Sequence, residues 1–171
     1  MDRTAAVEST QLNCDKGRPL TTQDLLALWE EHLKGEFVTK DEDESLATMV
    51  EDASVLAIPT GWGGRGKAQL RPLYRDQFIP SIPEGWQHTL MNRVITENCI
   101  VEEAIMRFHH TKRMDWLLPG VPPTGKPIEI EFVIFVEFRD GKMAAERIYW
   151  DQAKILRQVG LLQSQSAHGG E

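Results

Sequence analysis

Hydrophobic residues near the start of the chain repeat with a helical period. In residues 21–35, TTQDLLALWEEHLKG, apolar side chains recur every three to four positions, which predicts an amphipathic helix. Thr21 or Thr22 can cap its start, and Gly35 can end it. The apolar face of this predicted helix consists of Leu25, Leu28, Trp29 and Leu33.

Three shorter elements are predicted to follow. Residues 43–52 predict a second helix, with Leu46, Met49 and Val50 facing inward. Residues 53–59 are β-branched and brief, so they predict a strand that Pro59 stops. Residues 67–78 predict a third helix with a kink at Pro72; its apolar face would carry Leu70, Leu73 and Tyr74.

The second half of the chain changes to a period of two. Long runs of alternating residues predict four strands, in residues 86–98, 99–112, 126–143 and 142–152. The sequence RDGK at 139–142 predicts a tight hairpin turn, and residues 115–127, rich in proline and glycine, predict a loop. A final helix is expected in residues 151–162.

This order of elements, helices first and long antiparallel strands afterwards, is typical of an α+β fold in which helices cover one face of a curved sheet. A sheet that wraps around helices leaves a cone-shaped cavity, a common kind of ligand site. We expect a single domain over residues 21–162, a flexible arm at residues 1–20 and a flexible tail at residues 163–171.

The composition narrows the class of protein. The chain has 171 residues and a net charge of −7, without the basic stripe that nucleic acids or anionic membranes attract. No apolar stretch reaches the roughly 20 residues of a membrane span. Cys14 and Cys99 lie far apart and have no metal-type spacing. A cytoplasmic protein that binds neither nucleic acid nor membrane is the simplest interpretation.

The sequence GWGGRG at residues 61–66 matches the pattern G-x-G-x-x-G of dinucleotide-binding proteins. That function needs a parallel βαβ unit, whereas Pro59 interrupts the preceding strand and the strands that follow are antiparallel. The segment is therefore interpreted as a flexible turn before a helix. Trp62 within it could line or cover a pocket.

The histidines do not predict a metal site. His109 and His110 are neighbours on a predicted strand, so their side chains point to opposite faces. His88 lies on another strand without a ligand-type spacing. A single imidazole facing a cavity suits acid–base chemistry, and a hydrogen-bonded core histidine is an equal alternative.

The strand at residues 128–138, IEIEFVIFVEF, has one fully apolar face. Its other face mixes Glu129, Glu131 and Glu137 with Val133 and Phe135. Such a half-apolar face is either solvated or buried in a dimer, and we favour a homodimer through this outer face.

The sequence RIYWDQ, residues 147–152, raises the sharpest question about chemistry. Alternation places Arg147, Tyr149 and Asp151 on one face of the strand. Asp151 is a good N-cap for the helix that follows, but a desolvated carboxylate at a cavity would have a raised pKa and could transfer protons. Both interpretations stay open, and they are compatible.

Three segments of the chain resemble the SnoaL-like polyketide cyclase group of the nuclear transport factor two-like superfamily. They are FHHTKRMDWLLPGVPPTGKP at 108–127, FRDGK at 138–142 and RIYWDQAKILRQVGLL at 147–162. The resemblance covers residues 22–162 and implies an α+β cone, often dimeric. It implies no cofactor, and it implies a general acid–base role for Asp151 and a match of His110 to a family histidine. The acid and the tryptophan expected six and four residues before Asp151 are replaced here by Ala145 and Arg147.

The leading hypothesis is a cofactor-free cyclase, isomerase or dehydratase acting on a small apolar, carbonyl-bearing metabolite. Its expected catalytic residues are Asp151, His110 and Tyr149, and its expected substrate-binding residues are Trp62, Tyr74, Trp86, His88, Trp116 and Arg147. A non-catalytic ligand-binding or dimerisation module is the alternative. An epoxide hydrolase is a third possibility, although the sequence shows no aspartate placed beside Arg93 or Arg107.

Overall fold

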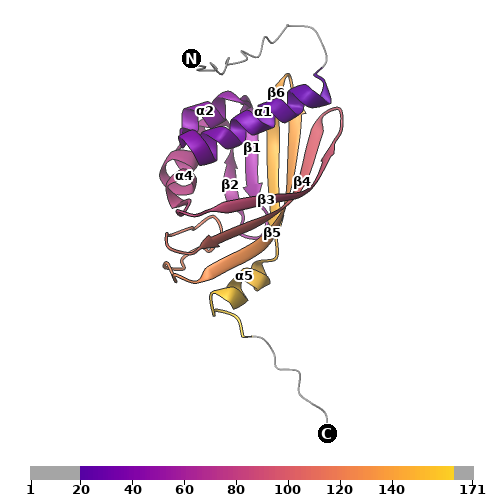
Figure 1. Cartoon of the computed structure of the whole chain (residues 1–171). Helices are drawn as coiled ribbons and strands as arrows, with labels where there is room; N and C mark the ends of the chain where they lie inside the picture. The colour runs from indigo at the N-terminus through magenta and orange to yellow at the C-terminus, as the bar shows by residue number, and fades with distance from the viewer. Residues whose placement is uncertain (1–19, 164–171) are drawn as a thin grey trace, which may run out of the picture.

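The computed structural model describes residues 20–163. Within these residues, five helices and two π-helical turns pack around a curved sheet of six strands, with the α1 helix lying across one side of the sheet (Figure 1). The predicted arm and tail lie outside the described residues, apart from Leu20 and Gln163 at their edges, and so does Cys14. The predicted α+β architecture is confirmed.

Helix α1, Thr22–Lys34, begins with a reciprocal cap between Thr21 and Asp24. Gly35 is the C-cap of α1, as the sequence predicted, but the helical path continues from it as a π-helical turn, η1 (Gly35–Thr39). The glycine also serves close packing. A Cβ at Gly35 would lie 2.4 Å from Ser45 Oγ, so this turn can press against α2, Glu42–Ala47, only without a side chain.

The predicted second helix is shorter than expected. Strand β1, Met49–Ala57, already begins within it, although Leu46, Met49 and Val50 are all buried as predicted. After β1 the chain forms the edge strand β2, Trp62–Arg65. The GWGGRG segment is thus mostly a strand antiparallel to β1.

A helical stretch then leads into the main sheet. It consists of α3 (Lys67–Leu73), the π-helical turn η2 (Tyr74–Phe78) and the single turn α4 (Ile79–Ser81). Pro72 lies inside α3, and the helix widens into the π-helical turn just after it. Leu70, Tyr74 and Phe78 are buried beneath the sheet.

The four long strands lie where alternation predicted them. They are β3 (Gln87–Ile95), β4 (Cys99–His109), β5 (Pro127–Arg139) and β6 (Lys142–Trp150), and they are followed by α5 (Gln152–Gln158). The order across the sheet is β2-β1-β6-β5-β4-β3. One pairing differs from the expected antiparallel pattern, because β1 runs parallel to β6, so the sheet is mixed.

The inner face of the sheet is set by register. On β5 the apolar face from Ile128 to Phe138 is buried, and Val136 pairs with Glu146 while Ile134 pairs with Ile148. Residues 146, 148 and 150 therefore face inward together. The partner of Phe138 shifts to Met143, and the extra residue Ala144 between the two registers is a β-bulge.

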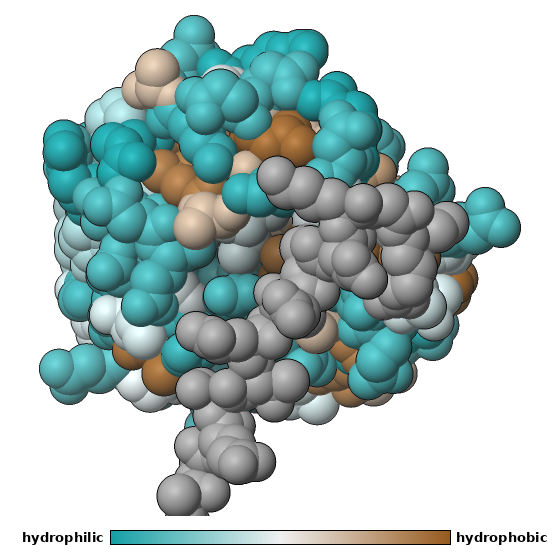
Figure 2. Space-filling model, turned by 90° about the horizontal axis from the view of Figure 1, so that it is seen from above, coloured by the Kyte–Doolittle hydropathy of each residue, from teal (hydrophilic) through white to brown (hydrophobic). Residues whose placement is uncertain are grey.

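The outside of the helical layer is hydrophilic. Seen from above, from the side of α1, the surface is mostly hydrophilic and carries several small hydrophobic patches (Figure 2). Among residues 20–163, no helix has the length and apolar character needed to cross a membrane.

Candidate active site

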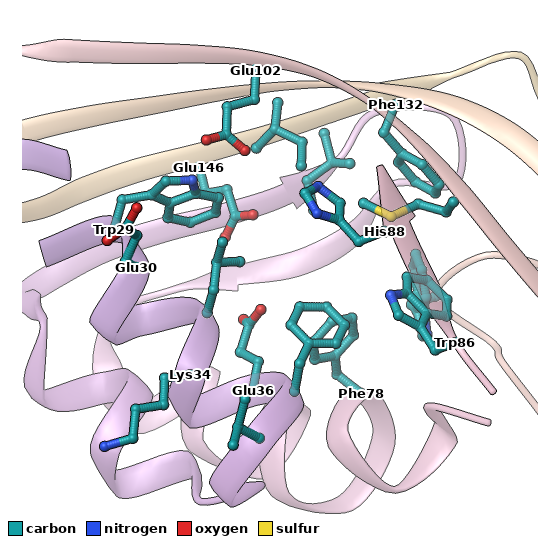
Figure 3. A pocket seen from close by; sticks show the side chains of 17 residues that line it. Trp29, Glu30, Lys34, Glu36, Phe78, Trp86, His88, Glu102, Phe132 and Glu146 are labelled. Atoms are coloured by element: carbon teal, nitrogen blue, oxygen red, sulfur yellow. The ribbon is translucent and has the colours of Figure 1, made fainter. Parts of the chain in front are cut away.

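A cavity of about 450 Å³ lies between the helical layer and the concave face of the sheet (Figure 3). Its walls are largely aromatic: Trp29, Phe37, Phe78, Trp86, Trp116 and Phe132. Three buried carboxylates, those of Glu36, Glu102 and Glu146, also line it. Apolar walls with a few buried polar groups are typical of a small-molecule site.

Two of these carboxylates meet a buried histidine, and we call His32, Glu36 and Glu146 the buried triad. The Nε2 atom of His32 lies 3.1 Å from Glu36 Oε1 and 4.0 Å from Glu146 Oε2. His32 and Glu36 come from neighbouring turns of the α1–η1 helical path, and Glu146 comes from β6. Both carboxylates line the cavity, whereas His32 lies behind them, stacked on Trp29.

The ring of His32 is fixed in one orientation. Its Nδ1 atom lies 3.1 Å from the carbonyl oxygen of Ser45 and 2.9 Å from Thr48 Oγ1. A carbonyl oxygen can only accept, so Nδ1 carries a proton and donates it there. Nε2 is left to face the two carboxylates of the triad.

Burial and nearby charges shift the pKa values of Glu146 and His32. Burial raises the pKa of Glu146 to about 8, and the charge of Glu36 adds to the rise while His32 opposes it. Burial by itself lowers the pKa of His32, but the carboxylates of Glu36 and Glu146 outweigh that effect and raise it. At neutral pH, Glu146 therefore holds a proton inside the cavity.

Tyr74 lies beneath the triad, with its hydroxyl oxygen 3.4 Å from His32 Nε2. Burial, followed by the charges of Glu36 and Glu146, raises its pKa well above the ordinary value. Tyr74 was predicted to line the pocket, but it supports the triad from behind and keeps its hydroxyl proton.

The triad also has the chemical types of a metal site. Among the described residues, the ligand atoms of His32, Glu36 and Glu146 lie within 4.8 Å of one another. One imidazole and two carboxylates could together bind a divalent cation. The 3.1 Å hydrogen bond between His32 and Glu36 joins two of these atoms directly, so we assign protons to the triad and test this assignment by metal removal below.

The third buried carboxylate has a separate partner. Arg93 Nε, on β3, donates to Glu102 Oε1 on β4 at 2.6 Å. Arg93 thus has an acidic partner that the sequence did not reveal, although it is a glutamate rather than the aspartate expected for an epoxide hydrolase. Arg107 pairs with Glu129, where both side chains are substantially exposed.

Asp151 does not face the cavity, which corrects the prediction from the sequence. Its side chain is exposed, and its Oδ1 atom accepts from the backbone N–H of Lys154 at 3.0 Å as the N-cap of α5. The reason is the register of β6: Ile148 and Trp150 face inward, so Arg147 and Tyr149 face outward. Of the two interpretations of Asp151, the structure supports the helix cap.

The other two predicted catalytic residues are also away from the cavity. Tyr149 is exposed on the outer face, edge-on to Phe135. His110 is buried, and its Nδ1 atom contacts Thr124 at 3.2 Å. Because Gly125 N–H donates to the carbonyl of His110, this residue anchors the loop after β4 and does not line the cavity.

The predicted substrate-binding residues divide evenly. Trp86, His88 and Trp116 line the cavity as expected, and His88 is exposed. Trp62 instead donates from Nε1 to Gln77 at 2.9 Å, and Arg147 pairs with Glu137 on the outer face. The structure therefore brings three of the six into the cavity, and Tyr74 lies just behind it.

The sequence analysis missed the triad, although a signal for it existed. Leu25, Trp29, His32 and Glu36 follow one another at spacings of four, three and four, so the two polar residues occupy the apolar face of the helix. A glutamate at position 146 likewise alternates with Ile148 on the inner face. Polar residues at core positions are the pattern that marks such a site.

Comparisons with known proteins agree with this fold. Residues 79–159 match the family profile described as SnoaL-like polyketide cyclase. A search of curated proteins found no match.

Among solved structures, three similar ones come from bacteria. A putative SnoaL-like polyketide cyclase from Jannaschia sp. CCS1 is 16% identical, with a TM-score of 0.66, covering 87% of this chain and 99% of that one. TsrD from Streptomyces laurentii is 18% identical, with a TM-score of 0.65 and coverages of 84% and 99%. AclR, a putative hydroxylase from Streptomyces galilaeus, is 17% identical, with a TM-score of 0.64 and coverages of 84% and 89%. At these identities the likeness shows the fold.

Proposed function

Taking the chain as a SnoaL-like protein of the nuclear transport factor two-like fold, we propose that it is an enzyme that transfers protons on a small apolar metabolite bearing a carbonyl group. The observation that carries the proposal is the buried triad, which exposes two carboxylates to an aromatic cavity. The reaction class would be cyclisation, isomerisation or elimination, and the residues that perform it would be those of the triad.

The two carboxylates differ in their contacts, which assigns their roles. Glu146 has a pKa of about 8 and is protonated near pH 7, so it can donate to a carbonyl oxygen that is becoming an enolate. Glu36 has its Oε1 atom 3.1 Å from His32 Nε2 and lines the cavity, where it is placed to take the proton from the carbon beside that carbonyl. His32 and Tyr74 lie behind and stabilise the charge that appears on the carboxylates.

A non-catalytic binding protein is the competing function. Asp151 and His110 fail to reach the cavity, and this removes the proton-transfer pair that the sequence suggested. The triad supplies a different pair, and its two carboxylates lie in the cavity itself. A buried carboxyl group with a pKa near neutrality is what proton transfer needs, whereas ligand holding does not require it.

An exchange assay tests the proposal without knowledge of the natural substrate. The probe is 2-tetralone in D2O, with incorporation of deuterium beside the carbonyl followed by NMR. We expect the protein to accelerate exchange and Glu146→Gln to lose at least about 100-fold of that acceleration, as removal of a general acid does. Asp151→Asn is the matched control and should keep full activity. Equal exchange by the wild type and Glu146→Gln would refute the role of the triad.

A further inference from the structure

Glu102 is a buried carboxylate that the proposed proton transfer does not use. It lies on the inner face of β4, is fully buried and lines the cavity, where Figure 3 shows it above Glu146. Its Oε1 atom accepts from Arg93 Nε at 2.6 Å. Its Oε2 atom has no hydrogen-bond partner anywhere in residues 20–163.

An unpaired carboxylate oxygen away from bulk water is costly. Removing a donor from such an acceptor costs its desolvation free energy, so native structures rarely leave one without a partner. Arg93 already compensates the charge of Glu102, and its own side chain is only 22% exposed. What the cavity side of Glu102 lacks is therefore a hydrogen-bond donor rather than a positive charge.

A second unpaired group lines the same cavity. The Nε1–H of Trp29 is buried and finds no acceptor within the described part of the chain. The cavity thus offers one unsatisfied acceptor and one unsatisfied donor. A hydroxyl group can both donate and accept, whereas an ammonium group only donates and an ether or ketone only accepts.

We propose that Glu102, supported by Arg93, is a recognition site for a neutral hydroxyl group of the ligand, which donates its hydrogen bond to Oε2. The substrate class is then a hydroxylated carbonyl compound, with the carbonyl at the triad and the hydroxyl at Glu102. This inference rests on the proposed function in taking the cavity as the ligand site and the triad as the partner of the carbonyl. The site would bind hydroxylated ligands more tightly than analogues without the hydroxyl, because such an analogue leaves Glu102 Oε2 unpaired.

Binding of four matched bicyclic compounds tests the site. Calorimetry would compare 2-tetralol with tetralin, 2-methoxytetralin and 2-aminotetralin on the full-length protein. We expect 2-tetralol to bind about 10- to 100-fold more tightly than tetralin or the ether, as one hydrogen bond to a charged group provides. In Glu102→Gln the amide oxygen can keep Arg93 while its NH2 faces the cavity and donates to an alcohol or an ether alike, so the preference for 2-tetralol over the ether should disappear.

Two variants distinguish hydroxyl recognition by Glu102 from a general effect of changing this strand and from the proposed proton transfer. Glu103→Gln changes the neighbouring exposed residue on the same strand and should retain the preference for the alcohol. Glu146→Gln should also retain it while losing deuterium exchange, so failure of the two proposals is distinguishable. A merely structural role for Glu102 would weaken all four compounds equally in Glu102→Gln. That result would overturn the proposal. So would any of three results with the wild type: equal binding of all four compounds, tightest binding of the amine, or no binding of 2-tetralol at 1 mM.

Discussion

The stability of the protein should fall between pH 6.5 and 8.5, and replacing Glu146 by glutamine should abolish most of this fall. Burial, together with the charge of Glu36, raises the pKa of Glu146 from 4.5 to about 8. In this range the folded carboxyl group keeps its proton, while the unfolded chain has already released it. The folded state therefore binds more protons, and the free energy of unfolding falls as the pH rises.

The size of the effect follows from the pH interval. From pH 6.5 to about 8, each pH unit removes 1.36 kcal/mol, which gives about 2 kcal/mol from Glu146. His32 acts in the same direction, since its raised pKa gives stability below pH 6.5 that is lost as the pH rises through the folded value. His88 and His110 have lowered pKa values and act below pH 6.5, outside the interval.

Urea unfolding followed by tryptophan fluorescence at pH 6.5, 7.5 and 8.5 measures this loss. The wild type should lose about 2 kcal/mol or more, and Glu146→Gln should lose about 2 kcal/mol less than the wild type. Glu103→Gln, changed at an exposed position, should follow the wild type. A wild type whose stability is flat across the interval, or an unchanged slope in Glu146→Gln, would refute the buried, protonated state of Glu146.

Three further results are expected. Dialysis against a chelator should leave deuterium exchange of 2-tetralone unchanged, and loss of activity that Zn²⁺ restores would instead make the triad a metal centre. Asp151→Ala should lower the free energy of unfolding by about 1 kcal/mol through loss of the α5 cap, without loss of exchange activity. Phe135→Glu should convert a homodimer into a monomer in light scattering, because Phe135 lies with Tyr149 on the outer sheet face; a monomeric wild type would contradict the predicted dimer.

Much of the fold could be predicted because its signals are local. Alternation located the long strands, and the turn at Asp140 and Gly141 has the positive φ angles, 52° and 74°, that an Asp-Gly hairpin requires. The path after Gly35 could not be predicted, since the π-helical turn depends on contact with Ser45, ten residues away in the sequence. The parallel pairing of β1 with β6 is equally non-local.

The site was harder to predict than the fold because alternation divides a strand into two faces without saying which is inside. The sequence placed Asp151 at the cavity, but the pairing of Val136 with Glu146 turns the opposite face inward. His32 and Glu36 were accessible to sequence reasoning, as polar residues on an apolar helix face. That they meet Glu146 depends on long-range packing, which no local pattern contains.

The parallel pairing of β1 with β6 has a consequence for synthesis on the ribosome. Val55 is paired with Glu146, so β1 must wait for 91 further residues before its parallel neighbour β6 exists. Two members of the triad come from the first helical segment and the third from the last strand. Because domains form as the chain emerges and distant contacts close late, a nascent or truncated chain that lacks β6 cannot assemble the triad. Activity would then appear only after β6 has been synthesised.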